Sequence, residues 1–301
     1  MMFDLIIIGA GPAGITASVY AARKKMNFLV ITKDIGGQAA WSGDIENYTG
    51  YQFITGPELA GKFEEHMRKY SIELKENEEV IELKRKENGF GVKTDKATYE
   101  AKTAVITSGK RSRELGVPGE VEFKNRGLTY CATCDGPLFA GKDVAVIGGG
   151  NSALDAALQL IQIAKHIYLI NITSALTGDA IMREKVSESK KVSILNSTRV
   201  TAILGDRMVS GIKIKREDKE ETLPVEGVFV EIGLIPNSEF AKELEKNELG
   251  EIRVNCRSET NIPGIFAAGD VTEVPEKQII VAAGEGAKAA LSAFRYLAQH
   301  K

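Results

Sequence analysis

The chain has 301 residues, of which 43% are hydrophobic and 27% charged, a composition typical of a globular protein with room for two domains. Its formal net charge is −2 and its pI is about 6.1, so it lacks the basic excess that nucleic acids and anionic membranes attract. Neither a secretion signal nor an apolar run approaching the ~20 residues that span a bilayer is visible, so we expect a cytoplasmic protein without nucleic-acid or membrane partners.

The N-terminal segment is predicted to fold as strand, glycine turn, helix and strand. An apolar run, FDLIIIG, precedes GAGPAG and an Ala-rich stretch of helical period, and NFLVIT (residues 27–32) supplies the second strand. Gly9, Gly11 and Gly14 have the G-x-G-x-x-G spacing of dinucleotide-binding turns. The first glycine permits the tight turn, the second lets a pyrophosphate approach the backbone, and the third permits close helix packing. One departure is that Thr32 and Lys33 stand where such units usually place an acidic residue.

The next segments predict a small antiparallel layer and then a second nucleotide-binding unit. Short strands are expected at VIELKRK, GFGVKT, ATYEA and TAVITSG, between residues 80 and 109. From residue 142, KDVAVIGGGNSALDAALQLIQ and HIYLIN repeat the plan of the N-terminal segment. Gly148 and Gly150 keep the first two glycines of the turn, and Ala153 replaces the third. More short strands are expected between residues 192 and 230.

Breaks in this pattern predict how the domains are arranged along the chain. The segments GVPGE (residues 116–120) and GLIPNSEF (residues 233–240) carry the glycines and prolines expected where a chain crosses between domains. We therefore expect a discontinuous first domain, residues 1–114 and 241–301, with a second domain, residues 115–240, inserted. The predicted fold class is α/β, with two Rossmann-like nucleotide-binding domains of the three-layer ββα type.

Two of the three cysteines lie three positions apart, in CATCDG. A metal site would need two more ligands, and Cys256 and the three scattered histidines lack ligand spacing, so we expect no metal. A structural bridge between Cys131 and Cys134 would close too short a loop to constrain the unfolded chain much. A redox pair at a helix start, where thiolates are favoured, is the stronger interpretation. Asp135 is either a general acid or a stabilising first-turn acid, and both roles can coexist.

FAAGDV, residues 266–271, is a further candidate site. An apolar strand delivers Asp270 to a tight turn at Gly269, where its carboxylate would accept hydrogen bonds from a polyol. The alternative is a helix-capping aspartate without a ligand. The presence of GAGPAG in the same chain favours the binding interpretation.

The order of these motifs resembles the low-molecular-weight thioredoxin reductases over essentially the whole chain. The resemblance is carried by GAGPAG, the GGQ at residues 36–38, ENYTG, CATCDG, GGGNSA, GIFAAGD and KQIIVAAGEGAKAA. The last of these is closer to the flavoprotein subunit of alkyl hydroperoxide reductase, an NADH enzyme. The resemblance implies a homodimer that reduces the disulfide of thioredoxin or a similar small protein.

The same resemblance implies the cofactors and the site residues. FAD would be bound in the first domain, and a nicotinamide dinucleotide in the second. Cys134 would face the flavin, Cys131 would attack the disulfide of the partner protein, and Asp135 would protonate a leaving thiolate. The implied FAD residues are Gly9, Gly11, Pro12, Ala13, Gly14, Gly37, Gln38, Asn47, Gly269, Asp270, Gln278 and Ile279, and the implied nicotinamide dinucleotide residues are Gly148, Gly150, Asn151, Ser152, Ala153 and Asn171.

The choice of electron donor depends on the segment that follows the second strand of the inserted nucleotide unit. NADPH-dependent thioredoxin reductases carry His-Arg-Arg there and a further arginine four residues later, whereas this chain reads NITSALT from Asn171 to Thr177. Without these cations, several charge-assisted contacts to a 2′-phosphate are lost, each worth ~1.5–3 kcal/mol. NADH is therefore favoured over NADPH, with Asn171 as a neutral acceptor for a ribose hydroxyl. A ferredoxin-type donor is an alternative, although the intact GGGNSA argues against it.

The leading hypothesis is a thioredoxin-disulfide reductase that passes two electrons from its donor through FAD and Cys131/Cys134 to thioredoxin or a similar dithiol protein. The second hypothesis is an NADH-dependent reductase of a glutaredoxin-like carrier that feeds a peroxidase. Because GAGPAG begins at residue 9, we expect that carrier to be a separate chain. A third hypothesis, a flavoprotein sensor without catalysis, would explain the missing arginines as lost activity.

Overall fold

The structure, a computed structural model, describes residues 2–42, 44–217 and 219–300 and divides into two units. The first comprises Met1–Arg111 and Ile235–Lys301, and the second comprises Ser112–Leu234. The two crossings are short strands, β9 (Lys110–Ser112) and β18 (Leu234–Pro236), which pair with each other.

The units divide a few residues away from the expected boundaries at 114/115 and 240/241. Residues 235–240 are held by the first unit, since the Leu83 N–H donates to the Phe240 carbonyl and Arg111 contacts Glu239 at 2.7 Å. The GVPGE segment is no crossing, because the Glu120 carboxylate accepts hydrogen bonds from backbone N–H groups within the second unit.

The first unit is built around a seven-stranded sheet in the order β5-β2-β1-β8-β7-β6, with β19 added beside the end of β8. Strands β5, β2, β1, β8 and β19 are parallel, and β7 and β6 are antiparallel. The elements of the first unit are β1 (Met2–Ala10), α1 (Pro12–Arg23), β2 (Phe28–Ile35), α2 (Gln38–Trp41), β3 (Asp44–Ile45), β4 (Ile54–Thr55), α3 (Gly56–Arg68), β5 (Glu73–Lys75), β6 (Val80–Lys86), β7 (Gly89–Thr94), β8 (Thr98–Ile106), β19 (Ile265–Ala267), the 3₁₀ turn η2 (Gly269–Val271) and α7 (Ile279–Gln299).

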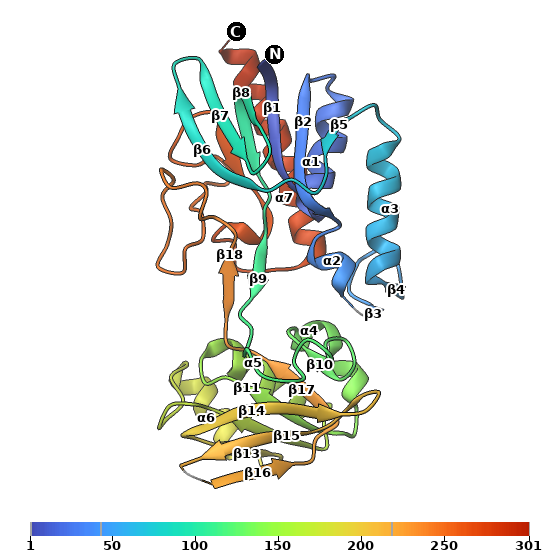
Figure 1. The fold of residues 1–301 in the computed structure, drawn as a ribbon, viewed down its shortest axis with the longest axis vertical. Coiled ribbons are helices and arrows are strands. Elements are labelled where there is room, and N and C mark those ends of the chain that lie inside the picture. Colours follow the sequence, from blue (N-terminus) through green and yellow to red (C-terminus); the bar gives the residue numbers. More distant parts are fainter. Residues whose placement is uncertain (1, 43, 218, 301) are drawn as a thin grey trace. The chain divides into compact units, whose positions relative to one another are not determined.

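Both faces of this sheet are covered, which explains why β1 is apolar at almost every position. Helices α1 and α7 cover one face (Figure 1), and Leu5 and Ile7 pack with residues of these helices. Ile6 and Ile8 pack on the other face, against the β6–β7 hairpin and residues of the 241–252 segment. Because parallel strands end at one edge, the turns after β1, β8 and β19 come together there.

The expected strands ATYEA and TAVITSG form one strand, β8, rather than two. The reason is that burial alternates without interruption through Ala101, Lys102 and Thr103, and no glycine or proline separates the two halves.

The second unit has a five-stranded parallel sheet in the order β10-β17-β11-β12-β13 and a three-stranded antiparallel sheet, β14-β15-β16. In β11, Val144 and Val146 pack against α5, whereas Ala145 and Ile147 pack against β14 and β15. This gives the ββα layers expected from the sequence, and the α/β fold class is confirmed. The elements of the second unit are β10 (Leu128–Thr129), α4 (Ala132–Asp135), the 3₁₀ turn η1 (Gly136–Phe139), β11 (Asp143–Ile147), α5 (Asn151–Ile161), β12 (His166–Ile170), α6 (Ala180–Glu188), β13 (Val192–Leu195), β14 (Thr198–Gly205), β15 (Val209–Arg216), β16 (Lys219–Leu223) and β17 (Gly227–Val230).

Across the described residues, no helix combines the length and the apolar character needed to cross a membrane.

Candidate active site

The first glycine loop joins β1 to α1 and has the geometry of a phosphate-binding turn. Gly9 has a φ of +104°, a left-handed conformation that favours glycine. A Cβ on Gly14 would lie 1.9 Å from the Gly9 carbonyl oxygen, so only glycine lets the helix approach the turn this closely. A Cβ on Gly11, by contrast, would meet no atom within 4 Å. The backbone is thus open at Gly11, as the close approach of a pyrophosphate requires.

The start of α1 leaves its backbone donors free for an anion. Pro12 occupies the first turn, no side chain caps the helix at Gly11, and no acidic residue lies in that turn. Thr32 stands where an acidic residue is usual, and its hydroxyl accepts a hydrogen bond from the Ala10 N–H at 3.1 Å. Thr32, which departs from the motif, therefore stabilises the first glycine loop through this hydrogen bond.

The turn after β19 brings Asp270 close to this loop. A Cβ on Gly269 would lie 3.1 Å from the Cβ of Ala13 in α1. Burial raises the pKa of the Asp270 carboxyl, and the positive charges of Lys277 and Lys110 oppose that rise. Within the described ranges, no protein group donates a hydrogen bond to this carboxylate. A partly buried carboxylate with free acceptor sites suits the hydroxyls of a ribityl chain.

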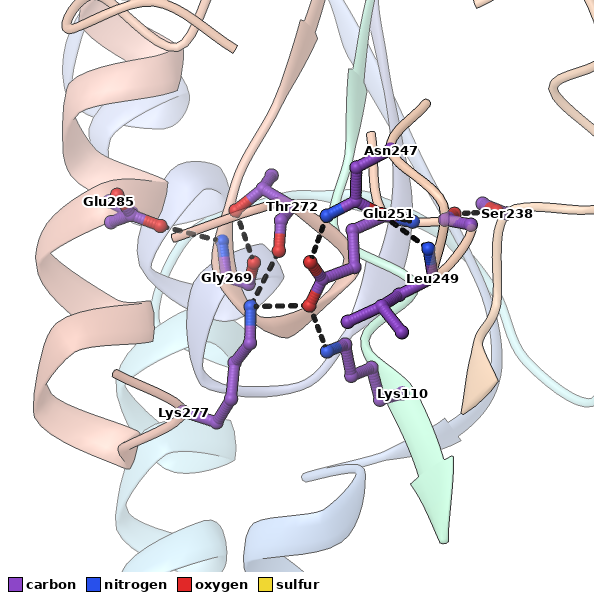
Figure 2. A network of polar contacts seen from close by, with 10 residues as sticks. Lys110, Ser238, Asn247, Leu249, Glu251, Gly269, Thr272, Lys277 and Glu285 are labelled. Atoms are coloured by element: carbon purple, nitrogen blue, oxygen red, sulfur yellow. Dashed lines mark hydrogen bonds and ion pairs between the residues drawn. The ribbon is translucent and has the colours of Figure 1, made fainter. Parts of the chain in front are cut away.

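Two lysines share one buried glutamate next to this turn (Figure 2). The Lys110 ammonium donates to Glu251 Oε1, and Lys277 Nζ lies 3.3 Å from the same oxygen. The other oxygen, Oε2, accepts a hydrogen bond of 2.5 Å from Asn247. Sequence reasoning did not identify this cluster, because nothing in the sequence relates Lys110 to Glu251 and the charged groups meet only in the fold.

Five more of the predicted FAD residues make contacts within the first unit. Gly37 approaches Gly11 so closely that a Cβ on it would lie 3.2 Å from the Gly11 Cα. The side-chain amide of Gln38 donates to the Lys110 carbonyl, and Asn47 Nδ2 donates to Gln278 Oε1 at 3.1 Å. Ile279 begins α7 and packs on a small apolar cluster, Ile45, Ile54 and Leu59. These contacts and the open turn at Gly11 fit FAD.

The cysteine pair lies in the second unit, at the start of the short helix α4. Cys131 and Cys134 form a disulfide with their Cα atoms 5.3 Å apart, and both residues are partly exposed. The Cys134 N–H donates to Cys131 Sγ at 3.2 Å. Asp135 ends the helix, and its carboxylate accepts a hydrogen bond from the Thr129 hydroxyl. The third cysteine, Cys256, is a free and exposed thiol in the first unit.

A second carboxyl near the disulfide was missed by sequence reasoning. Glu231 follows β17 directly, and its Oε1 accepts a hydrogen bond of 3.3 Å from the Ala132 N–H, one peptide unit from Cys131. Burial, with a smaller contribution from the negative charge of Asp155, raises the pKa of Glu231 to about 7. The available signal was an acidic residue at the carboxyl end of an apolar strand, beside the second glycine loop.

The second glycine loop, between β11 and α5, repeats the geometry of the first. Gly148 has a φ of +145°, and a Cβ on it would lie 2.3 Å from the Glu231 carbonyl oxygen. A Cβ on Gly150 would meet nothing within 4 Å, as at Gly11. Ala153 is fully buried at the position of the third glycine. This loop fits the pyrophosphate of a dinucleotide for the same reasons as the first.

Asn171 lies beneath this loop rather than at its surface. Its side chain is buried, donates to the Thr173 carbonyl and to Asn196 at 3.1 Å each, and accepts from the hydroxyl and the N–H of Thr173. A Cβ on Gly149 would lie 2.3 Å from its oxygen. The contact with a ribose hydroxyl expected from the sequence would require Asn171 to exchange these bonds. Asn151 is also engaged, since its side chain accepts from the Asp179 N–H at 2.7 Å.

The family model of the pyridine nucleotide-disulphide oxidoreductases matches residues 3–286. The chain belongs to this family. The resemblance expected from the sequence is thereby confirmed, and so is the enzyme class at the level of an FAD-dependent oxidoreductase. Membership of the pyridine nucleotide-disulphide oxidoreductases implies FAD and a pyridine nucleotide as cofactors.

Individual members of the family resemble the chain closely. The thioredoxin reductase of Streptococcus pyogenes is 38% identical, with a TM-score of 0.93 and 99% of each chain covered. An alkyl hydroperoxide reductase subunit of Pseudomonas aeruginosa is 43% identical over 98% of this chain and 58% of its own length. A Bacillus subtilis protein named NADH dehydrogenase is 41% identical with the same two coverages. The chain therefore spans little more than half the length of these two curated relatives.

Proposed function

We propose that this chain is a reductase of protein disulfides that uses a pyridine nucleotide, FAD and the Cys131/Cys134 pair. The observation that carries the proposal is the partly exposed disulfide at the start of α4, in the same unit as the second glycine loop. FAD, when bound, supplies a two-electron carrier between a nicotinamide and a disulfide. The first unit would hold FAD through the residues around Gly11 and Asp270, and the second would hold the pyridine nucleotide.

The cysteines and Asp135 would carry out the exchange with the protein substrate. In the reduced pair, the Cys131 thiolate attacks one sulfur of the substrate disulfide, so that a mixed disulfide forms and one substrate thiolate leaves. Cys134 then attacks Cys131 Sγ, which restores the Cys131–Cys134 disulfide and releases the second substrate thiolate. Asp135, held by Thr129, would give a proton to a leaving thiolate.

NADH is the favoured donor in this proposal. Residues 172–175 are exposed and carry no charge, so the segment offers no cation to a 2′-phosphate. The name of the Bacillus subtilis relative, NADH dehydrogenase, points in the same direction. NADPH is the less favoured donor, and a ferredoxin-type donor is disfavoured because the second glycine loop keeps its geometry.

Thioredoxin or a similar dithiol protein is the proposed partner, with a homodimer in the cytoplasm as the working form. The likeness to a thioredoxin reductase over the full length of both chains supports thioredoxin. The likeness to the alkyl hydroperoxide reductase of Pseudomonas aeruginosa supports the second candidate, reduction of a glutaredoxin-like carrier that serves a peroxidase.

The test is turnover with a donor, a candidate partner and variants of each cysteine. We expect wild type to reduce thioredoxin or the glutaredoxin-like carrier, and Cys131→Ser and Cys134→Ser to abolish this while still binding FAD. Cys134→Ser should also accumulate a mixed disulfide through Cys131. Cys256→Ser is the matched control and should retain full turnover. Flavin that stays oxidised with NADH, NADPH and reduced ferredoxin would instead favour the non-catalytic sensor.

A further inference from the structure

The cluster of Lys110, Glu251 and Lys277 carries more positive than negative charge in a largely buried place. The side chains of Lys110 and Glu251 are only 6% and 8% exposed, and that of Lys277 is 16% exposed. Lys277 also donates to the Thr272 carbonyl at 2.5 Å, which fixes its ammonium group (Figure 2). An ammonium group shielded from water is costly unless an anion compensates it.

The Lys277 ammonium lies against the turn that carries Asp270, since it donates to the carbonyl of Thr272, whose hydroxyl in turn donates to the Gly269 carbonyl at 2.8 Å. Both lysines act on the Asp270 carboxyl electrostatically, and they oppose the effect of burial, which favours the neutral acid. With Asp270 ionised, two cations face two carboxylates. Glu285 is the remaining charged group that acts on Asp270, and it favours the neutral acid. The Glu285 carboxylate is committed to the Gly269 N–H at 3.1 Å and to Lys288 at 3.4 Å.

The cluster is also joined to other residues of the FAD cradle. The Lys110 carbonyl accepts a hydrogen bond from the side-chain amide of Gln38. Lys277 directly precedes Gln278, which accepts a hydrogen bond from Asn47. The cluster is therefore linked to Gln38 by a hydrogen bond and to Gln278 by a peptide bond, and it acts on Asp270 electrostatically.

We propose that Lys110, Glu251 and Lys277 position FAD by keeping Asp270 ionised, so that its carboxylate accepts strong hydrogen bonds from the ribityl hydroxyls. A carboxylate accepts hydrogen bonds about twice as strong as a neutral group does. Glu251 holds the two ammonium groups in place. Its single negative charge offsets one of their two positive charges, and the remaining positive charge stabilises the ionised carboxylate of Asp270. The proposal rests on the proposed function in one respect, that the first unit binds FAD.

The test is the affinity of the full chain, stripped of FAD, for added FAD across a range of pH. Lys110→Met removes one cation but leaves Glu251 paired with Lys277. Because the Asp270 carboxyl then loses a stabilising charge, its pKa rises. We expect Lys110→Met to bind FAD about tenfold more weakly at the acidic end of the range and to recover part of that loss as the pH is raised. Wild type should show a smaller dependence on pH over this range.

Asp270→Asn separates this role from simple packing. This variant should weaken FAD binding at every pH, and adding Lys110→Met to it should cause little further loss. Losses that add up in the double variant, or a loss in Lys110→Met that does not vary with pH, would overturn the proposal. If Lys110→Met does not fold, Lys277→Met gives the same comparison, since Lys110 then pairs with Glu251.

Lys102→Met is the matched control for the loss of a lysine. Lys102 forms an exposed ion pair with Asp4 in the same unit, at 2.8 Å. Its replacement by methionine should leave FAD binding unchanged. Failure of the wild-type chain to bind FAD would refute the proposed function itself. Normal binding by wild type with additive losses would refute only the role of the lysines.

Discussion

The carboxyl of Glu231 lies at the start of the helix that carries the two cysteines. Its hydrogen bond to the Ala132 N–H places a group with a pKa of about 7 one peptide unit from Cys131. A proton gained or lost there changes the local charge next to the dithiol, which matters because thiolates are the reactive form of cysteine. Asp135 is therefore not the only carboxyl that can influence this pair.

Glu231 should make stability depend on pH in a defined direction. Its pKa in the folded chain lies above its ordinary value of 4.5, so folding favours the protonated form. The resulting stabilisation is complete below about pH 4.5 and is lost as the pH rises through about 7, by up to ~3 kcal/mol in the free energy of unfolding. Denaturant unfolding at a series of pH values should show this decline in wild type.

Glu231→Gln should remove that decline, because the amide does not titrate. Glu226→Gln is the control, since it makes the same change of charge at an exposed position in the same unit. A wild-type decline that persists in Glu231→Gln would show that another group causes it.

Among single residues, sequence reasoning found those that belong to motifs and missed those that depend on burial. Gly9, Gly11 and Gly14 were identified because each answers a local steric requirement of the turn. Lys110 and Glu251 were missed because they are 141 residues apart, and nothing local shows that either is buried. Asn171 was identified by position, but its hydrogen bonds turn it toward the protein.

At the scale of elements, the two glycine loops separate positions that maintain the fold from a position that serves a ligand. Gly11→Ala should leave thermal stability almost unchanged, because its Cβ would meet no atom of the described residues within 4 Å. FAD binding should weaken by about tenfold or more, because the added methyl group occupies the space that a pyrophosphate needs. Thermal unfolding of the FAD-free chain and an FAD titration give the two quantities.

Gly61→Ala is the matched control, since its Cβ also meets nothing and Gly61 lies inside α3. It should raise stability by about 0.5–1 kcal/mol, as expected for alanine in a helix, without changing FAD binding. FAD affinity in Gly11→Ala equal to that of wild type would contradict the assignment of this loop.

The segment after β12 offers a second prediction at this scale, on the choice of donor. Ile172 is 62% exposed, and it lies in the segment where the NADPH-dependent thioredoxin reductases that the sequence resembles are expected to carry arginine. Ile172→Arg should raise the rate of flavin reduction by NADPH relative to NADH by about tenfold, through one charge-assisted contact to the 2′-phosphate. Ile181→Arg, 63% exposed on α6, adds the same charge elsewhere in the unit and should have little effect. Equal shifts in both variants would contradict a specific contact.

At the scale of the whole molecule, the repeated strand, turn and helix was enough to predict the fold class. Two copies of one local pattern predict two similar units, and both sheets have the parallel core that this pattern implies. The boundaries were less predictable, because residues 235–240 contain turn-forming residues yet are held in the first unit by hydrogen bonds to distant residues such as Leu83.

The most direct test of the central claim, that FAD exchanges electrons with the Cys131/Cys134 pair, is an anaerobic titration of the FAD-loaded protein with NADH, followed by flavin absorbance. Wild type should need about two equivalents of NADH per chain for complete bleaching, because the flavin and the disulfide each take two electrons. The double variant Cys131→Ser/Cys134→Ser should need about one equivalent, because only the flavin remains. Bleaching of both proteins by the same amount of NADH would show that the disulfide does not communicate with the flavin, and would contradict the account.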